Sequence, residues 1–136
     1  MPTTEDDTDD LGRALAVLGP LEARIMRTVW TGSIGQPFVV RDMLVHLPEL
    51  AYTTVMTTLN RLADKGLLVA EAVPGQRAHA YRAVGRPADF LAAVSAQAVK
   101  ELVDRYGDVA LAAFAAQLGG LSADQLRRLE RLGREE

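Results

Sequence analysis

The sequence predicts a mainly α-helical chain with one small β hairpin, on the basis of three observations. Apolar residues recur at helical spacing over most of the 136 residues, and aromatic residues make up only 5%. Between residues 67 and 84 the spacing becomes an alternation of period two around a Pro-Gly turn. Pro and Gly residues divide the helical stretches into short segments. This length suits one domain with a full core, or a small domain with an appendage.

The composition is that of a soluble globular protein and excludes several classes of protein. No run approaches the roughly 18 apolar residues of a membrane-spanning helix. The absence of cysteine excludes disulfides, thiol redox chemistry and thiolate metal sites, and no cofactor or metal is expected. The N-terminus reads Met-Pro-Thr-Thr and then turns acidic, the opposite of a secretory signal, so we expect a cytoplasmic protein without membrane insertion.

The net charge of −3 is distributed unevenly along the chain. Residues 1–10 carry −5, residues 11–84 carry +3 and residues 85–136 carry −1. Because residues 1–10 combine like charge with almost no apolar content, we interpret them as a disordered acidic tail. The positive balance of residues 11–84 is mild and by itself would support only weak, non-specific phosphate binding.

Helical segments follow the acidic tail. The pattern turns helical at residue 11, and a second helix is predicted over residues 20–30, with its proline in the first turn. A loop with a short extended piece at residues 37–38 comes next. Residues 40–47 are predicted as a short helix that Pro48 closes, since the residue before a proline avoids the helical region.

Only residues 48–50 separate this short helix from the next predicted helix, 51–66. Two short helices joined by such a turn form a helix-turn-helix. Residues 67–73 and 78–84 then alternate as two strands about the turn 74–77. A hairpin directly after the second helix is the wing of a winged helix, which we predict to occupy residues 11–84.

Helix 51–66 has two different faces. Val55, Leu59 and Leu62 form an apolar stripe, and Gly66 is the stop signal. The other face is polar, with short side chains. The helix as a whole has four threonines within six positions, although threonine is a mediocre helix former. Such side chains fit a DNA groove without steric conflict, and the alternative is an ordinary solvated helix. The predicted DNA contacts on this face are Thr53, Thr54, Met56, Thr57, Asn60 and Arg61.

Cations at two places are expected to hold phosphates. Arg61 and Lys65 lie near the end of helix 51–66. Arg77 lies in the wing segment 73–78, where a guanidinium can reach a phosphate or the minor groove. The alternative for Arg77 is a solvated turn residue.

Residues 85–136 read as three helices, over about 87–106, over 109–118, and from the capping-box pattern at Ser122 onward. These helices cover one another only partly, and helix 109–118 is apolar on nearly all sides. We therefore predict a helical dimerisation domain that a second copy covers; the alternative is a monomer whose helices fold back over the N-terminal domain. The predicted dimer contacts are Phe90, Leu91, Val94, Leu102, Phe114, Leu118, Leu126 and Leu129.

Three stretches, LGPLEARIMRTVW at 18–30, LAYTTVMTTLNRLADKGLL at 50–68 and QRAHAYRA at 76–83, carry a family resemblance. Together they resemble the penicillinase-repressor family of bacterial regulators, also called the BlaI/MecI/CopY family. The resemblance runs from about residue 18 to the end and is strongest over 50–68. It implies a winged-helix domain, a helical dimerisation domain, and repression of transcription by a homodimer on a palindromic operator in double-stranded DNA.

The resemblance also implies roles for particular residues. It places base contacts on Thr53, Thr54, Met56 and Thr57, a backbone contact on Arg61, and Arg77 in the wing. Recognition is thus expected through helix 51–66 and wing 73–78.

Release of the operator is expected by proteolysis or by another signal. In the antibiotic-resistance branch of the family, a membrane-bound sensor protease causes repressor cleavage at an Asn-Phe bond. The comparable position here is Ala113-Phe114, which lacks the Asn. The copper-responsive branch uses a C-terminal cysteine motif, which this chain lacks, so copper sensing of that kind is excluded.

Other functions were weighed against repression. No catalysis is expected, because His46 and His79 lie on different predicted elements and no nucleophile–base pair or glycine-rich phosphate loop is present. The main alternative is a ligand-responsive winged-helix regulator with a small-molecule effector site between the domains. A winged helix used only for protein contacts is disfavoured by the threonine-rich face, since protein-binding faces bury aromatic and large apolar groups.

Overall fold

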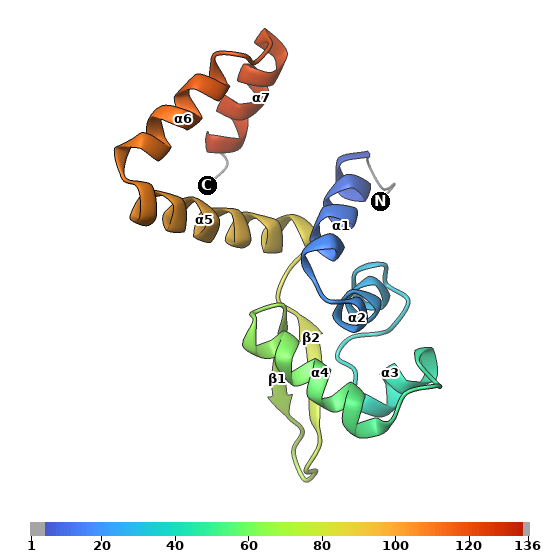
Figure 1. Ribbon diagram of the computed structural model, residues 1–136. Helices are drawn as coiled ribbons and strands as arrows, with labels where there is room; N and C mark the ends of the chain where they lie inside the picture. The colour runs from blue at the N-terminus through green and yellow to red at the C-terminus, as the bar shows by residue number, and fades with distance from the viewer. Residues whose placement is uncertain (1–4, 135–136) are drawn as a thin grey trace. The chain divides into compact units, whose positions relative to one another are not determined.

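A computed structural model describes residues 5–134 of the chain (Figure 1). Over these residues helices predominate and one antiparallel hairpin is present, which confirms the predicted fold class. In chain order the elements are α1 (Glu5–Val17), α2 (Pro20–Trp30), α3 (Val40–His46), α4 (Tyr52–Asp64), β1 (Leu68–Ala72), β2 (His79–Ala83), α5 (Pro87–Tyr106), α6 (Asp108–Leu118) and α7 (Ala123–Arg134).

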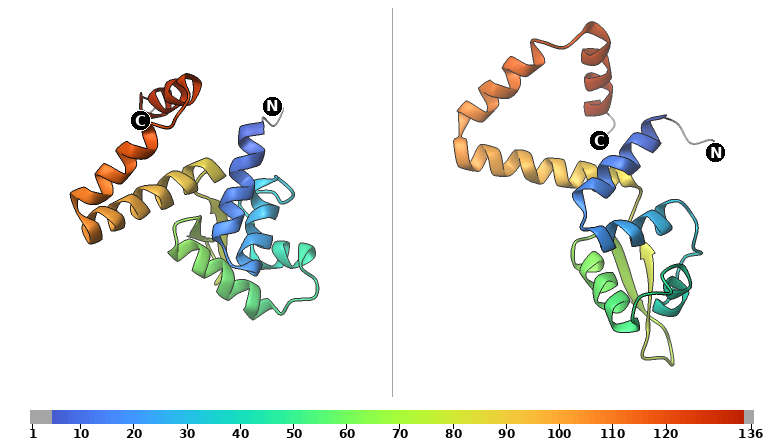
Figure 2. Two further views of the ribbon diagram at one scale, coloured as in Figure 1. Left: turned by 45° about the horizontal axis from the view of Figure 1, so that its top comes forward. Right: turned by 45° about the vertical axis from the view of Figure 1, so that its right-hand side comes forward.

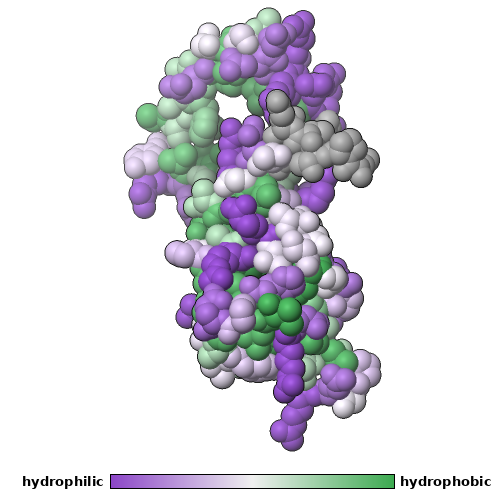
Figure 3. Space-filling view, turned by 90° about the vertical axis from the view of Figure 1, so that its right-hand side faces the viewer, coloured by the Kyte–Doolittle hydropathy of each residue, from purple (hydrophilic) through white to green (hydrophobic). Residues whose placement is uncertain are grey.

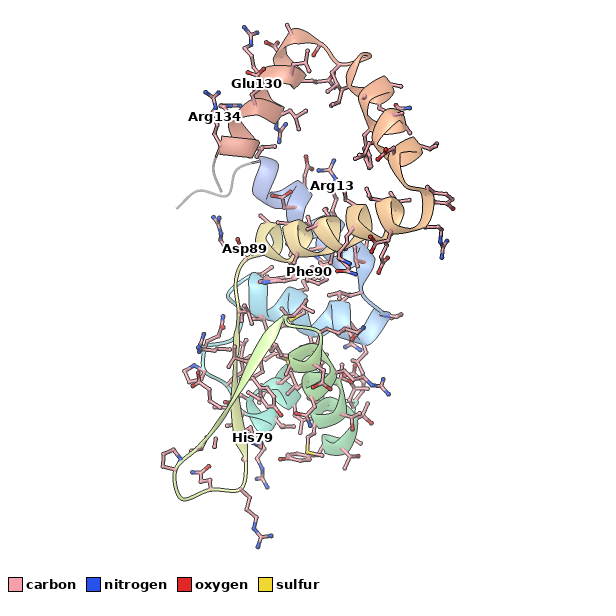
Figure 4. All side chains as sticks on the ribbon, turned by 90° about the vertical axis from the view of Figure 1, so that its left-hand side faces the viewer. Arg13, His79, Asp89, Phe90, Glu130 and Arg134 are labelled. Atoms are coloured by element: carbon pink, nitrogen blue, oxygen red, sulfur yellow. The ribbon has the colours of Figure 1, made fainter. Side chains whose placement is uncertain are left out.

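The chain divides into two compact units, Met1–Ala93 and Val94–Glu136. The boundary predicted from the sequence lies earlier, between residues 84 and 85. The boundary falls inside α5 because the beginning of that helix packs against the first unit. Phe90 points from α5 toward α2 (Figure 4), and its ring centroid lies 6.1 Å from that of Trp30.

The core of the first unit forms where α2, α3 and α4 meet the hairpin (Figures 1 and 2). Met26 of α2, Met43 of α3 and Leu59 of α4 are all completely buried. The strands contribute Leu68 and Tyr81, each 2% exposed. This fold follows from the helical spacing of the apolar residues, since each helix turns one stripe toward the same centre.

Strands β1 and β2 pair antiparallel, with Leu68 opposite Ala83 and Ala72 opposite His79. Phe38 adds an isolated bridge to Tyr81 through two backbone hydrogen bonds, of 2.9 and 2.7 Å between nitrogen and oxygen. The predicted extended piece at residues 37–38 is therefore confirmed at residue 38, whereas residue 37 lies in a bend. Because this bridge holds β2 against the loop that precedes α3, the wing is anchored at its base while its tip stays free.

The expectation of a disordered tail over residues 1–10 is wrong for residues 5–10, which belong to α1. Residues 1–4 lie outside the described part of the chain. Carboxylates near a helix N-terminus interact favourably with the positive end of the helix dipole, so the like charge does not prevent a helix here. Further along α1, Ala14 and Leu15 are buried against the core, which anchors the helix to the first unit.

The second unit contains the end of α5 together with α6 and α7. Ser122 and Gln125 form the predicted capping box, with hydrogen bonds of 2.9 and 3.2 Å that join each backbone N–H to the other side chain. In α6, which is described completely, Ala110 is the only buried residue. The unit therefore presents many of its large apolar side chains to solvent.

Candidate nucleic-acid interface

Helix α4 ends at a position that its sequence explains. Ala51 is the N-cap in an extended conformation, without a side-chain hydrogen bond to the helix. The helix ends at Lys65 and Gly66, and Gly66 has a φ of +83°, a left-handed conformation that favours glycine. Since the backbone N–H of Leu67 then bonds to the carbonyl oxygen of Leu62 at 2.9 Å, the chain reverses directly into β1.

The inner face of α4 is completely removed from solvent. Val55, Leu59 and Leu62 have no exposed area. Thr58, one of the four threonines of the helix, is also buried, and its hydroxyl donates to the carbonyl oxygen of Thr54 at 2.8 Å. This burial fixes the rotation of α4 about its axis, so the side of the helix that faces solvent is well determined.

The outer face presents the polar residues that the sequence analysis singled out. We call this group, made of Thr53, Thr54, Met56, Thr57, Asn60 and Arg61, the recognition face. All of its members are exposed except Met56, which is half-buried. Most of these side chains are short, so another molecule could approach the helix backbone closely between them.

Asn60 connects the recognition face to the wing. Its side-chain oxygen accepts a hydrogen bond of 2.8 Å from the hydroxyl of Tyr81 in β2. Burial raises the pKa of the Tyr81 hydroxyl, and the nearby Tyr52 raises it further. Because the hydroxyl therefore keeps its proton, it remains a donor to Asn60, and the amide nitrogen of Asn60 is left for an outside acceptor.

Lys65 is already engaged within the chain. Its ammonium group lies 2.9 and 3.0 Å from the two carboxylate oxygens of Glu22 in α2. Burial alone would raise the pKa of Glu22, but the hydrogen bonds from Lys65 and from the backbone N–H of Gly19 outweigh it and lower that pKa. Lys65 thus ties the end of α4 to the start of α2, and a contact with phosphate would compete with this pair.

Arg61 and Arg77 are more available than Lys65. Neither guanidinium forms a hydrogen bond or ion pair with another residue in the part of the chain that the structure describes. Arg77 lies in the turn between the strands, and hydrophilic atoms form the tip of the wing at the bottom of Figure 3. By contrast, Arg82 on β2 pairs with Glu71 on β1 at 2.9 Å, so the body of the wing is neutralised across its strands.

Two further residues belong beside these candidates. Arg41, exposed on α3, has no hydrogen bond or ion pair with any described residue, and α3 contacts α4. Tyr52 is the first residue of α4 and is 42% exposed. From the sequence Arg41 is only one of the cations of residues 11–84, because nothing local distinguishes a cation on α3 from any other surface cation.

The predicted dimer contacts fall into two groups. Phe90 already packs against Trp30 in the first unit, and Leu91 and Val94 are half-buried on the same helix. The other residues are exposed in the second unit, and some of them line an apolar cavity of about 290 Å³ between α5 and α6. These exposed residues are Leu102, Phe114, Leu118, Leu126 and Leu129.

Within residues 5–134 no helix is long and apolar enough to cross a membrane. Among the same residues, no three histidine or acidic side chains gather as a metal ion would require.

Comparison with known proteins identifies relatives of this chain. The chain is 36% identical over 118 residues to transcriptional regulator BlaI of Mycobacterium tuberculosis, in both strain CDC 1551 / Oshkosh and strain H37Rv. The alignment covers 84% of this chain and 83% of the relative. The model of a protein family described as penicillinase repressor matches residues 18–135, which include α4, the wing and all three C-terminal helices. The chain belongs to the penicillinase repressor family.

Proposed function

We propose that this protein represses transcription by binding a palindromic DNA operator as a homodimer. One observation carries the proposal: α4 buries one face completely and turns a face of small polar side chains and an uncommitted guanidinium to solvent. In a helix-turn-helix protein the second helix lies in the major groove, where hydroxyl and apolar groups can contact base edges. Membership in the penicillinase repressor family supports the same function.

In this proposal the residues of the site divide their roles. Thr53, Thr54 and Thr57 contact base edges, including thymine methyl groups, together with Met56. Arg61 and Arg77 contact the phosphates, and Lys65 joins them only if its pair with Glu22 opens. Asn60 holds the wing in register with α4 through Tyr81.

The exposed apolar residues of α5, α6 and α7 support the homodimer. Soluble monomers rarely expose contiguous apolar patches larger than a few hundred Å². Here Leu102, Phe114 and Leu118 are each at least 40% exposed, and Leu126 and Leu129 on α7 are similar. A second copy related by a two-fold axis would cover these residues and bring two recognition faces to two operator half-sites.

Release of the operator is proposed to follow cleavage or another signal that weakens the dimer. Ala113 and Phe114 lie in the middle of α6 and are both exposed. A sensor protease would have to unwind α6 to cut there, because a protease active site takes an extended chain. Cleavage would divide the apolar surface that we assign to the dimer. We also propose that the protein acts in the cytoplasm, where its DNA lies.

The experiment is selection of binding sites from a random pool of double-stranded DNA, followed by fluorescence anisotropy on the selected duplex. We expect a sequence with two inverted half-sites. Thr57→Glu should weaken binding by at least about a hundredfold, because it places an unpaired carboxylate among phosphates and bases. Circular dichroism and sedimentation should show that the fold and the dimer are retained.

Arg105→Ala is the matched control, since it changes the net charge by the same amount on α5 in the second unit, and Arg105 is not part of the recognition face. It should change affinity by less than about twofold. Equal affinity of the Thr57→Glu variant and the wild type for the duplex would show that α4 does not contact DNA. Failure to select any sequence would argue against sequence-specific binding altogether.

A further inference from the structure

A pocket of about 390 Å³ lies on the first unit, away from the recognition face. It is lined by Asp10 and Leu11 of α1, Trp30 and Thr31 at the end of α2, and Arg86 with Pro87 at the start of α5. Helix α1 ends at residue 17, before the segment 18–135 that matches the family model. One wall of this pocket is therefore made by a helix outside the matched segment. The volume is within the range of small-molecule sites.

The floor of the pocket includes Trp30, which is held in a fixed position. Its ring nitrogen donates a hydrogen bond of 3.0 Å to the carbonyl oxygen of Gly85, and its ring contacts Phe90. With the N–H engaged, the half-buried indole has its ring left to interact with a ligand. An indole ring is the side chain that attracts an organic cation most strongly.

The pocket is lined by one cation, Arg86, and one carboxylate, Asp10, and only Asp10 lacks a charged partner. The guanidinium of Arg86 lies 3.9 Å from the carboxylate of Asp89, which also accepts a 2.8 Å hydrogen bond from the backbone N–H of Arg86 (Figure 4 shows Asp89 at the start of α5). The start of α5 is thus balanced by its own acid. Asp10 is half-buried, and its carboxylate forms no hydrogen bond or ion pair with any of the residues 5–134.

The C-terminal end of α2 also lies at the pocket, and the last carbonyl groups of a helix carry partial negative charge, although the carbonyl oxygens of residues 27–29 already accept backbone hydrogen bonds from residues 31–33. Trp30 and Thr31 stand at this end. An unpaired carboxylate, a helix C-terminus and an indole ring together favour a positively charged group. Leu11 and Pro87 supply apolar surface for the rest of such a ligand.

We propose that this pocket binds a small organic cation with an apolar body, such as an aryl or alkyl ammonium compound. The ammonium group lies against the carboxylate of Asp10 and the ring of Trp30. The apolar body contacts Leu11 and the start of α5. This site goes beyond the proposed operator binding, and its test involves no DNA, so either proposal can fail without the other.

The test uses the full chain and the fluorescence of Trp30, which is the only tryptophan of the sequence. Benzyltrimethylammonium is the probe, with ionic strength held constant by sodium chloride. We expect a saturable change in emission with a midpoint below about 10 mM, as a small ligand with one charged contact permits. Benzyl alcohol and benzenesulfonate should bind at least about tenfold more weakly, because they lack the positive charge.

Substitutions test the geometry. Asp10→Asn should weaken the binding of benzyltrimethylammonium by about five- to tenfold. Arg86→Gln should strengthen the binding of this probe by about two- to threefold, since the substitution removes the competing cation and leaves Asp89 uncompensated. Asp9→Asn is the matched control, because Asp9 is exposed on the same helix and does not line the pocket; it should change the midpoint by less than twofold.

Several outcomes would overturn the proposal. They are no saturable response to benzyltrimethylammonium, an equal response to benzenesulfonate, or equal weakening by Asp9→Asn and Asp10→Asn. The comparison among the three probes uses the wild-type chain, so it remains decisive even if a variant unfolds.

Discussion

Helix α4 buries Val55, Leu59 and Leu62 completely, whereas α6, which has a more apolar sequence, buries only Ala110 among its residues 108–118. In α4 the apolar stripe is met by side chains from α2, α3 and the hairpin of the same unit. In α6 the large side chains Val109, Leu111, Phe114 and Leu118 remain exposed. The apolar face of α4 is buried by side chains of the same unit, whereas the large apolar side chains of α6 are not.

If the proposed homodimer forms, the difference determines how far each helix depends on a partner molecule. A helix whose apolar face is already buried can present its polar face to DNA without rearrangement. A helix with exposed apolar residues over much of its circumference gains stability only when further surface covers it. We therefore expect substitutions in α4 to act on folding and DNA binding, and substitutions in α6 to act on association.

The largest expected effect on folding is that of Leu59→Ala in α4. Removing a completely buried leucine leaves a cavity and should lower the free energy of unfolding by about 2–5 kcal/mol. Val109→Ala on α6, where the side chain is 74% exposed, should cost less than about 0.5 kcal/mol. Urea denaturation at one chain concentration measures both. A similar loss of free energy of unfolding at the two positions would contradict the difference in burial proposed to separate α4 from α6.

Phe114→Glu should act on the dimer instead. A charge buried against apolar surface without a partner should raise the dissociation constant of the dimer by about a hundredfold. Ala112→Glu is the matched control, because the 3.6-residue repeat of a helix places residue 112 nearly opposite residue 114. Sedimentation equilibrium measures both. If Ala112→Glu dissociates the dimer as strongly, α6 does not contact its partner through the face assigned here.

Removing either free guanidinium should weaken DNA binding by about tenfold, whatever the sequence of the duplex. Arg61→Ala and Arg77→Ala should each reduce the slope of log affinity against log salt concentration by about 1, since each releases one counterion fewer. Anisotropy titrations at several salt concentrations provide the slope. Arg105→Ala is the control, and its slope should equal that of the wild type. An unchanged slope in Arg77→Ala would leave the wing tip as a solvated turn.

Tyr81→Phe should sharpen the account of how α4 holds the wing. The substitution removes the hydroxyl that donates to Asn60 and should cost about 1 kcal/mol in the free energy of unfolding. Tyr52→Phe is the control, because the Tyr52 hydroxyl donates no hydrogen bond to the described residues. Urea denaturation again measures both, and a neutral Tyr81→Phe would mean that backbone pairing alone positions the wing.

The smallest effect is expected from Glu22→Gln, which removes the ion pair with Lys65. At pH 7 the loss should be below about 1 kcal/mol, as for other partly exposed pairs. Because the folded pKa of Glu22 is lower than its ordinary value of 4.5, its contribution is present above pH 4.5 and is lost as the pH falls through the folded pKa. The variant and the wild type should therefore converge in acid, and urea midpoints at pH 7 and pH 3 should show it. A difference that does not shrink between pH 7 and pH 3 would contradict this account.

Much of the fold could be predicted from local signals. Prolines and glycines fixed the bounds of α2 and α5, since Pro20 and Pro87 begin these helices as expected. The start of α1 could not be predicted in the same way. Its acidic residues suggest disorder when they are considered alone, and only the packing of Ala14 and Leu15 on the core shows that the helix is anchored.

The site was predictable where it depends on periodicity and not where it depends on distant partners. The spacing of Val55, Leu59 and Leu62 was enough to place the recognition face on the opposite side of α4. The pairing of Lys65 with Glu22, 43 residues away, and of Asn60 with Tyr81, 21 residues away, could not be inferred from local sequence. Both pairings depend on how α4 packs in three dimensions.

The spacing of the two operator half-sites tests the central claim most directly. Two recognition helices of one dimer should read half-sites on the same side of the duplex, one helical turn or a multiple of it apart. Inserting about five base pairs, half a turn, between the selected half-sites should lower the affinity by at least about tenfold, with two chains bound per intact operator. Unchanged affinity after the insertion, or one chain per operator, would contradict the account.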